Sequence, residues 1–226
     1  MEKEIGYITS LIGDPVRTNI LWTLLDGRAY TATELAIQAD TSPQNISMHL
    51  SKLISADLLT VESQGRHKYY RFSRQEVAYA IEAIGNLIPT EKHKRIISNP
   101  DNSTIKYCRT CYDHLAGKVG VLMTEALIKQ KIIELNASDY SVTKKGDKFF
   151  SELEINTDEL KKHRRIFAKP CLDWSERKHH LAGSLGASLL DKMLLLDWLR
   201  KTSHSRAIII TSKGQQQLYN TLKISL

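Results

Sequence analysis

The residues best suited to chemistry form two similar groups: Cys111, Asp113 and His114, and Cys171, Asp173 and His180. Thiolates and imidazoles bind transition metals, and a thiolate in a basic environment reacts readily with oxidants and electrophiles. If the two groups pack about a pseudo-twofold axis, their Cys-x-Asp pairs approach one another. That arrangement would suit a metal site or a thiol-based sensor, so these six residues are candidates for an effector site.

The bland alternative is that the repeated cysteines and aspartates pack and cap equivalent helices, and the sequence alone favours it. Cys108 and Cys111 form a C-x-x-C pair, but a structural zinc site needs four ligands. A redox C-x-x-C pair usually accompanies a βαβ pattern, which this sequence lacks. We therefore assign no metal from the sequence, require no cofactor, and interpret the pair as small side chains near a helix start.

The two groups belong to an internal repeat. His114–Gly120 (HLAGKVG) returns 66 residues later as His180–Gly186 (HLAGSLG), and Val142–Gly146 returns 68 residues later as Ile210–Gly214. Each copy has the pattern of a long helix, a short hairpin and a helix. The repeat predicts a C-terminal domain, residues 108–226, of two related winged-helix-like units.

A second set of polar residues lies near the N-terminus. Ser42-Pro43 is a typical helix start, and Ile46, Leu50 and Leu53 would form the buried stripe of that helix. The remaining residues predict a face that reads base edges and phosphates in a major groove. They are Ser42, Gln44, Asn45, Ser47, Met48, Ser51 and Lys52.

A predicted β-hairpin follows this helix. Its strands are 59–62 and 68–72, with Gln64-Gly65 at the turn. Arg66, His67 and Lys68 would place positive charge at the hairpin tip, where it can contact the DNA backbone or minor groove.

Further helices are predicted at 3–12, 15–25, 34–39 and 73–88, the last capped by Ser73. This order of elements predicts a winged helix-turn-helix domain over 1–88 that binds DNA and forms a dimer, followed by a linker at 89–107. The fold class is mainly α with small β-hairpins.

Four segments of this domain resemble the ArsR family of winged-helix repressors: Gly13–Arg17, Thr33–Ala36, Ser47–Leu53 and Gln64–Tyr70. The resemblance implies a homodimer formed by the first and last helices of the domain, bound to a two-fold symmetric operator in double-stranded DNA. The longer chain resembles a subgroup whose C-terminal domain carries Cys-Leu-Asp-Trp-Ser-Glu-Arg, here Cys171–Arg177.

The familiar metal sites of that family are absent. Residues 34–40, before the predicted recognition helix, contain no cysteine or histidine, and residues 76–87 contain no histidine. Arsenic or zinc sensing therefore does not carry over from the resemblance. No nucleotide-binding glycine loop, nucleophile elbow or zinc-protease motif is present, so we expect a regulator and not an enzyme.

Composition limits the partners. The formal net charge is +7, yet residues up to 88 carry −2 and the rest carry +9, so local clusters matter more than the total. No apolar run is long enough to span a membrane, and the N-terminus has no secretory pattern, so we expect the cytoplasm. The effector is unidentified: a small molecule, a thiol-reactive compound or a protein. The alternatives to a repressor are a thiol- or metal-dependent sensor and a DNA-binding scaffold for a protein partner.

Overall fold

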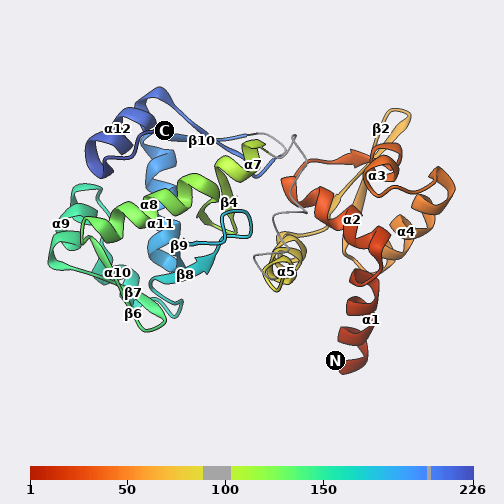
Figure 1. Ribbon diagram of the computed structural model, residues 1–226, viewed down its shortest axis with the longest axis horizontal. Coiled ribbons are helices and arrows are strands. Elements are labelled where there is room, and N and C mark those ends of the chain that lie inside the picture. The colour runs from red at the N-terminus through yellow and green to blue at the C-terminus, as the bar shows by residue number, and fades with distance from the viewer. Residues whose placement is uncertain (89–102, 203–204) are drawn as a thin grey trace. The chain divides into compact units, whose positions relative to one another are not determined.

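The computed structural model of the chain describes residues 1–88, 103–202 and 205–226 (Figure 1). Within these limits the chain divides into two compact units, unit 1 (Met1–Leu87) and unit 2 (Ile88–Leu226). Most of the linker predicted at 89–107 lies outside the described residues. Its last five residues form the short helix α7 (Ser103–Tyr107).

Unit 1 contains five α-helices, which are α1 (Glu2–Ile12), α2 (Pro15–Thr23), α3 (Ala32–Gln38), α4 (Pro43–Ser55) and α5 (Gln75–Gly85). Their starts follow from local hydrogen bonds. The Asp14 carboxylate accepts the N–H of Arg17 at 3.0 Å, and Thr31 forms a capping box with Glu34. Such caps satisfy N–H groups that the helix leaves without partners.

The sheet of unit 1 has three strands, β1 (Tyr30–Thr31), β2 (Leu59–Gln64) and β3 (His67–Phe72), in the order β1-β3-β2. Strands β2 and β3 form the predicted hairpin, and its two-residue turn needs the positive φ of Gly65 (+61°). The sequence did not reveal β1, because two residues are too few to show an alternating pattern. Tyr30 of β1 pairs with Tyr70 of β3.

The core of unit 1 lies where the helices meet the base of the hairpin. Its most buried side chains are Ile20, Leu21, Leu24, Leu35, Ile46, Leu50, Leu53 and Leu59. Each fully buried aliphatic side chain contributes about 1.5–3 kcal/mol to folding. One boundary differs from the expectation: α5 begins at Gln75 after Arg74, and the hydroxyl of Ser73 donates to the carbonyl of Asp57 instead of capping the helix.

Unit 2 contains two copies of one hairpin-helix-hairpin-helix order. Repeat 1 (109–152) comprises β4 (Arg109–Cys111), β5 (His114–Ala116), α8 (Gly117–Lys129), β6 (Ile133–Asn136), β7 (Asp139–Val142) and α9 (Lys144–Glu152). Repeat 2 (169–222) comprises β8 (Lys169–Leu172), β9 (His179–Ala182), α11 (Gly183–Leu195), β10 (Leu199–Lys201), β11 (Ile208–Ile210) and α12 (Ser212–Leu222). Helix α10 (Thr157–Lys162) connects them.

This architecture confirms the predicted fold class, a winged helix-turn-helix unit followed by a domain of helices and small antiparallel hairpins. The sequence missed the hairpin that opens each repeat. Its strands of three or four residues are short, and two of the four run directly into a helix. Among the described residues, no helix has the length and apolar character needed to cross a membrane.

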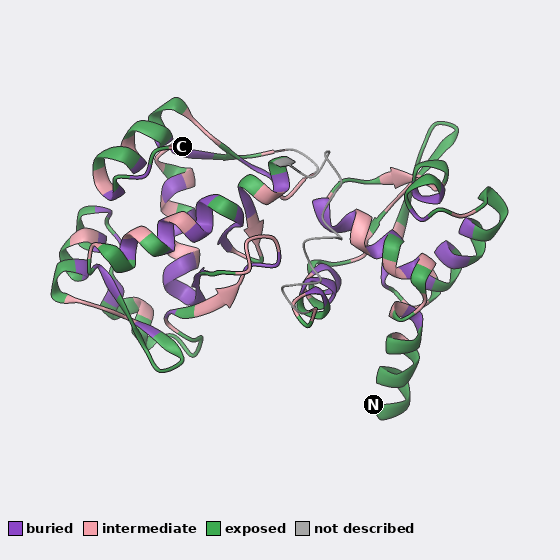
Figure 2. Cartoon of the chain, in the orientation of Figure 1, coloured by how far each residue is buried: buried purple, intermediate pink, exposed green. Residues whose placement is uncertain are grey.

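Helices α8 and α11 supply much of the core of unit 2, and Figure 2 shows the extent of their buried surface. Val119 and Leu127 of α8 and Leu185 of α11 have no exposed surface. The Leu181 N–H of repeat 2 donates to the Thr124 hydroxyl of repeat 1 at 2.8 Å. The repeats therefore share one core and one hydrogen-bond network.

The repeated Thr-x-x-Gly motif has a steric cause. Thr143 and Thr211 cap α9 and α12 by accepting the N–H of Gly146 and Gly214, at 3.0 and 2.9 Å. A Cβ atom on Gly146 would lie 2.0 Å from the Ile132 carbonyl oxygen, and one on Gly214 would lie 2.0 Å from that of Trp198. Each second helix can therefore approach its hairpin only through glycine.

We expect Gly214→Ala to destabilise unit 2 by about 1–3 kcal/mol, because the methyl group would displace a backbone carbonyl. Gly6→Ala is the control, since a Cβ atom there meets nothing within 4 Å. That change should be neutral or slightly stabilising, because alanine favours a helix more than glycine does. Urea denaturation followed by circular dichroism measures both, and equal midpoints for the two variants would contradict the steric argument.

Candidate nucleic-acid interface and cysteine–histidine cluster

Helix α4 has one buried side and one polar side. The Ser42 hydroxyl caps it by accepting the N–H of Asn45 at 3.2 Å, and Pro43 occupies its first turn. Ile46, Leu50 and Leu53 are at most 1% exposed. The residues expected to read DNA are all exposed, namely Ser42, Gln44, Asn45, Ser47, Met48, Ser51 and Lys52.

The polar groups of this face differ in availability. The hydroxyls of Ser47 and Ser51 donate to carbonyls of their own helix, at 3.3 and 2.8 Å. The side-chain amides of Gln44 and Asn45 have no hydrogen-bond partner in the part of the chain that the structure describes. These two amides are therefore the groups of α4 best able to bind another molecule.

The tip of the β2–β3 hairpin is fully exposed. Arg66, His67 and Lys68 follow the turn at Gly65, and none of them has an ion-pair partner among the described residues. The base of the hairpin is fixed, because Tyr70 and Phe72 pack against the core of unit 1. The hairpin thus holds three basic side chains at the end of a short, anchored arm.

A buried polar contact that the sequence analysis missed lies between α4 and the start of α2. His49 of α4 is buried, and its Nδ1 lies 3.4 Å from the Asp14 carboxylate at the start of α2. The pKa of Asp14 lies below its usual range mainly because its carboxylate accepts the backbone N–H of Arg17. Desolvation by burial raises this pKa, whereas the charges of Arg17 and His49 lower it further. The Arg17 Nε donates in turn to the Leu11 carbonyl at 2.6 Å. The motif Gly-Asp-Pro-Val-Arg therefore joins α1, α2 and α4.

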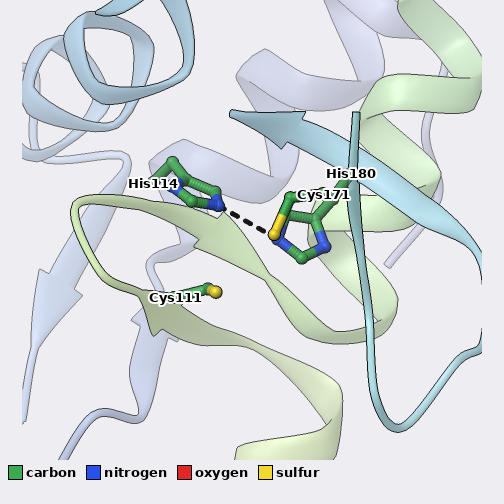
Figure 3. Close-up of side chains that lie close together, drawn as sticks. All are labelled: Cys111, His114, Cys171 and His180. Atoms are coloured by element: carbon green, nitrogen blue, oxygen red, sulfur yellow. Dashed lines mark hydrogen bonds between the residues drawn. The ribbon is translucent and has the colours of Figure 1, made fainter. Parts of the chain in front are cut away.

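In unit 2 the two opening hairpins bring four side chains together. Cys111, His114, Cys171 and His180 each offer one sulfur or nitrogen atom, and these atoms all lie within 4.8 Å of one another. We call them the cysteine–histidine cluster. Figure 3 shows the side chains of the β4–β5 and β8–β9 hairpins converging on one space.

Pairing between strands builds this cluster twice. Cys111 lies opposite His114 across β4 and β5, and Cys171 lies opposite His180 across β8 and β9. Both histidines are buried, and their Nε2 atoms are 3.1 Å apart. Both cysteines are half-buried, and neither forms a disulfide.

The two aspartates lie outside the cluster and behind its histidines, whereas the sequence led us to expect the two Cys-x-Asp pairs to approach one another. The His114 Nδ1 lies 3.4 Å from Asp113, which also binds Arg165 at 2.8 Å. The His180 Nδ1 lies 3.5 Å from Asp173, but it has no hydrogen-bond partner among the described residues.

Asp173 is the most connected of these residues. It accepts hydrogen bonds from Arg109 Nη2 at 2.9 Å, from the Gly117 N–H that begins α8 at 2.7 Å, and from the Ser175 hydroxyl at 2.7 Å. Its burial would by itself raise its pKa, but the Arg109 charge and the hydrogen bonds from the Ser175 hydroxyl and the Glu176 N–H hold the pKa well below the usual range. The carboxylate therefore stays charged in a fully buried position.

The motif Cys171–Arg177 forms the turn that makes these contacts. Trp174 is buried, and its ring lies 4.7 Å from the Arg109 guanidinium carbon. The sequence analysis did not identify Arg109 as a partner, because an arginine within a C-x-x-C pair gives no sign that it will be buried. The turn accounts for the extra residues between Cys171 and His180 compared with Cys111 and His114.

Cys108 does not belong to the cluster. It is completely buried in the apolar core of unit 2, and burial raises the pKa of its thiol to about 12. Cys108 is thus a packing residue, as expected for the C-x-x-C pair. Cys111, by contrast, lies on a strand and not near a helix start.

Comparison with known proteins places this geometry in a family. The helix-turn-helix domain family matches residues 12–62. The uncharacterised HTH-type transcriptional regulator YdfF of Bacillus subtilis is 42% identical over 226 residues, which cover all of both chains. The HTH-type transcriptional regulator CmtR of Mycobacterium tuberculosis is 31% identical over 87 residues, 38% of this chain and 70% of CmtR.

Among solved structures, one similar fold is the homodimeric winged helix-turn-helix DNA-binding domain of Mb0332 from Mycobacterium bovis, described as a possible ArsR-family regulator. It is 18% identical, covers 43% of this chain and 87% of that one, and has a TM-score of 0.36. The match to YdfF extends over both units and shows the family. The chain belongs to the HTH-type transcriptional regulators, and it is a DNA-binding regulator and not an enzyme.

Proposed function

We propose that this protein is a repressor that binds a two-fold symmetric operator as a homodimer through residues 1–88 and is modulated through residues 108–226. The observation that carries the proposal is the exposed polar face of α4, with two unpartnered amides, beside a basic hairpin tip. The resemblance of unit 1 to ArsR-family repressors supports the direction of regulation.

In this proposal α4 lies in the major groove. Gln44 and Asn45 pair with adenine edges, because a side-chain amide matches the donor and acceptor that adenine presents there. Ser42, Ser51 and Lys52 face phosphates, Ser47 tolerates several bases, and the half-exposed Met48 suits a thymine methyl group.

The hairpin tip contacts the DNA backbone or the adjacent minor groove. Arg66 and Lys68 supply charge there, and His67 can donate a hydrogen bond to a phosphate. Because backbone contacts carry no sequence information, the tip would contribute affinity and α4 would contribute specificity.

The dimer interface would consist of α1 and α5. Their exposed apolar side chains are Ile5 (57%), Tyr7 (51%) and Ile84 (43%), followed by Leu87 (81%) after α5. Packing these side chains across a two-fold axis would remove them from water and place two copies of α4 about 34 Å apart, one turn of DNA.

We expect Asn45→Ala to weaken operator binding by roughly 1–3 kcal/mol and to relax the preference at one base position. Ser55→Ala, at the opposite end of α4, is the matched control and should bind like the parent. Fluorescence anisotropy with the operator and with single-base variants measures both effects. An equal loss on all sequences, including random DNA, would assign Asn45 to the backbone and not to a base.

We expect Arg66→Ala to weaken binding to operator and random DNA alike. The slope of log K against log salt should fall by roughly 0.9 for each lost phosphate contact, or about 2 for a dimer. The parent should lose about 10³-fold or more in affinity between about 50 and 200 mM salt. Arg71→Ala is the control, because Arg71 lies on the same hairpin but pairs with Glu62 at 3.4 Å. An unchanged slope for Arg66→Ala would remove the tip from the interface.

Dimerisation is tested by Ile5→Glu, which places a charge on the exposed face of α1. We expect monomers in sedimentation velocity at micromolar concentration, and weaker operator binding. Ile37→Glu is the matched control, since Ile37 is 73% exposed on α3 and should leave the dimer intact. A parent protein that sediments as a monomer, or an Ile5→Glu variant that stays dimeric, would refute this interface.

A further inference from the structure

We propose that the cysteine–histidine cluster binds one zinc-like divalent cation, with Cys111, His114, Cys171 and His180 as its four ligands. The ion would sit where the opening hairpins of the two repeats meet. This site lies wholly within unit 2, so the proposal does not depend on operator binding by α4.

The cluster has nearly the size and composition of a tetrahedral zinc site. In a tetrahedral zinc site with two nitrogen and two sulfur ligands, the ligand atoms lie about 3.3 to 3.8 Å apart. The two Nε2 atoms are already 3.1 Å apart, and all four ligand atoms lie within 4.8 Å of one another. Small side-chain rotations are enough to form the site. Four protein ligands also leave no open position, which is typical of a structural or sensory ion and not of a catalytic one.

Both imidazoles turn their Nε2 atoms toward the centre of the cluster. Each Nδ1 faces a carboxylate, Asp113 for His114 and Asp173 for His180. A carboxylate on one ring nitrogen favours the proton there, and this leaves the Nε2 lone pair free to bind a metal. The two Nε2 atoms face each other within hydrogen-bond distance, 3.1 Å, in a buried position. A cation between them would displace the shared proton and replace one hydrogen bond with two metal–nitrogen bonds.

The total charge of the four ligands suits a divalent cation. Two thiolates and two neutral imidazoles carry a total charge of −2, which a divalent cation neutralises. A neutral complex is the form best suited to a partly buried site, because an uncompensated charge is unfavourable where water is partly excluded. Thiolate and imidazole ligands also favour zinc over the hard cations calcium and magnesium, which bind oxygen ligands.

Each repeat supplies half of the site. Each hairpin supplies one cysteine and one histidine from directly opposite strand positions. Each histidine also lies against a glycine of the other repeat's helix. A Cβ atom on Gly186 would be 3.3 Å from the Cβ of His114, and one on Gly120 would be 3.7 Å from that of His180. A bound ion would therefore link repeat 1 to repeat 2.

The test uses the full-length protein, stripped of metal with a chelator under reducing conditions and titrated with Co²⁺. We expect one Co²⁺ per chain, with the visible bands of tetrahedral cobalt and a thiolate-to-cobalt charge-transfer band. Zn²⁺ should displace the cobalt. Zn²⁺ should also raise the midpoint of thermal unfolding of the stripped protein, because a ligand that binds only the folded state stabilises it.

The variants Cys171→Ser and His180→Gln should lose cobalt affinity by more than the roughly 10- to 100-fold typical of changes behind the ligands. Cys108→Ala and His179→Gln are the matched controls. Cys108 is the one cysteine of the chain outside the cluster and lies in the core, and His179 is exposed beside His180. Both controls should bind cobalt like the parent.

The titration of the parent protein decides the matter even if a ligand variant fails to fold. A parent without a tetrahedral thiolate–cobalt spectrum, or with a Cys111–Cys171 disulfide in place of the metal when isolated from cells, would overturn the proposal. Loss of binding in Cys108→Ala as large as in Cys171→Ser would also overturn it, because the ion would then use other ligands.

Discussion

The buried ion pair between Arg109 and Asp173 is the contact on which the arrangement of unit 2 depends. Arg109 begins the first hairpin of repeat 1 and Asp173 follows the first strand of repeat 2, and the two side chains are at most 1% exposed. Removing one partner of such a pair typically costs about 3–5 kcal/mol, because the other charge stays buried and uncompensated. The pair therefore admits one relative placement of the two hairpins, and the cysteine–histidine cluster lies between them.

Asp173 carries out several tasks at once. It accepts the first N–H of α8, it holds the turn that buries Trp174 against Arg109, and it lies behind His180. A carboxylate that accepts so many hydrogen bonds remains ionised, as its lowered pKa indicates. The carboxylate behind His180 is thus part of the hydrogen-bond network that holds the fold together.

Unit 1 uses a related arrangement of residue types. Asp14 lies near both Arg17 and the ring of His49, as Asp173 lies near Arg109 and the ring of His180. In unit 1 the result is a fixed α4 whose polar face stays exposed. In unit 2 the result is a pair of imidazoles that face each other. In each unit an aspartate that pairs with an arginine also lies beside a histidine ring, 3.4 Å from His49 Nδ1 in unit 1 and 3.5 Å from His180 Nδ1 in unit 2.

The sequence by itself determined those features that depend on neighbouring residues. Helix starts at Asp14-Pro15 and Ser42-Pro43, the β2–β3 hairpin, the exposed face of α4 and the internal repeat all follow from local patterns, since caps, turns and periodicity act over a few residues. Only the tertiary structure decided which residues of the two repeats meet. The sequence grouped the cysteines, aspartates and histidines as one candidate site, whereas the fold places the cysteines with the histidines and the aspartates behind them. Cross-strand register pairs each cysteine with a histidine inside one hairpin. The meeting of the two hairpins depends on the buried Arg109–Asp173 contact, which joins residues 64 apart and which no local pattern records.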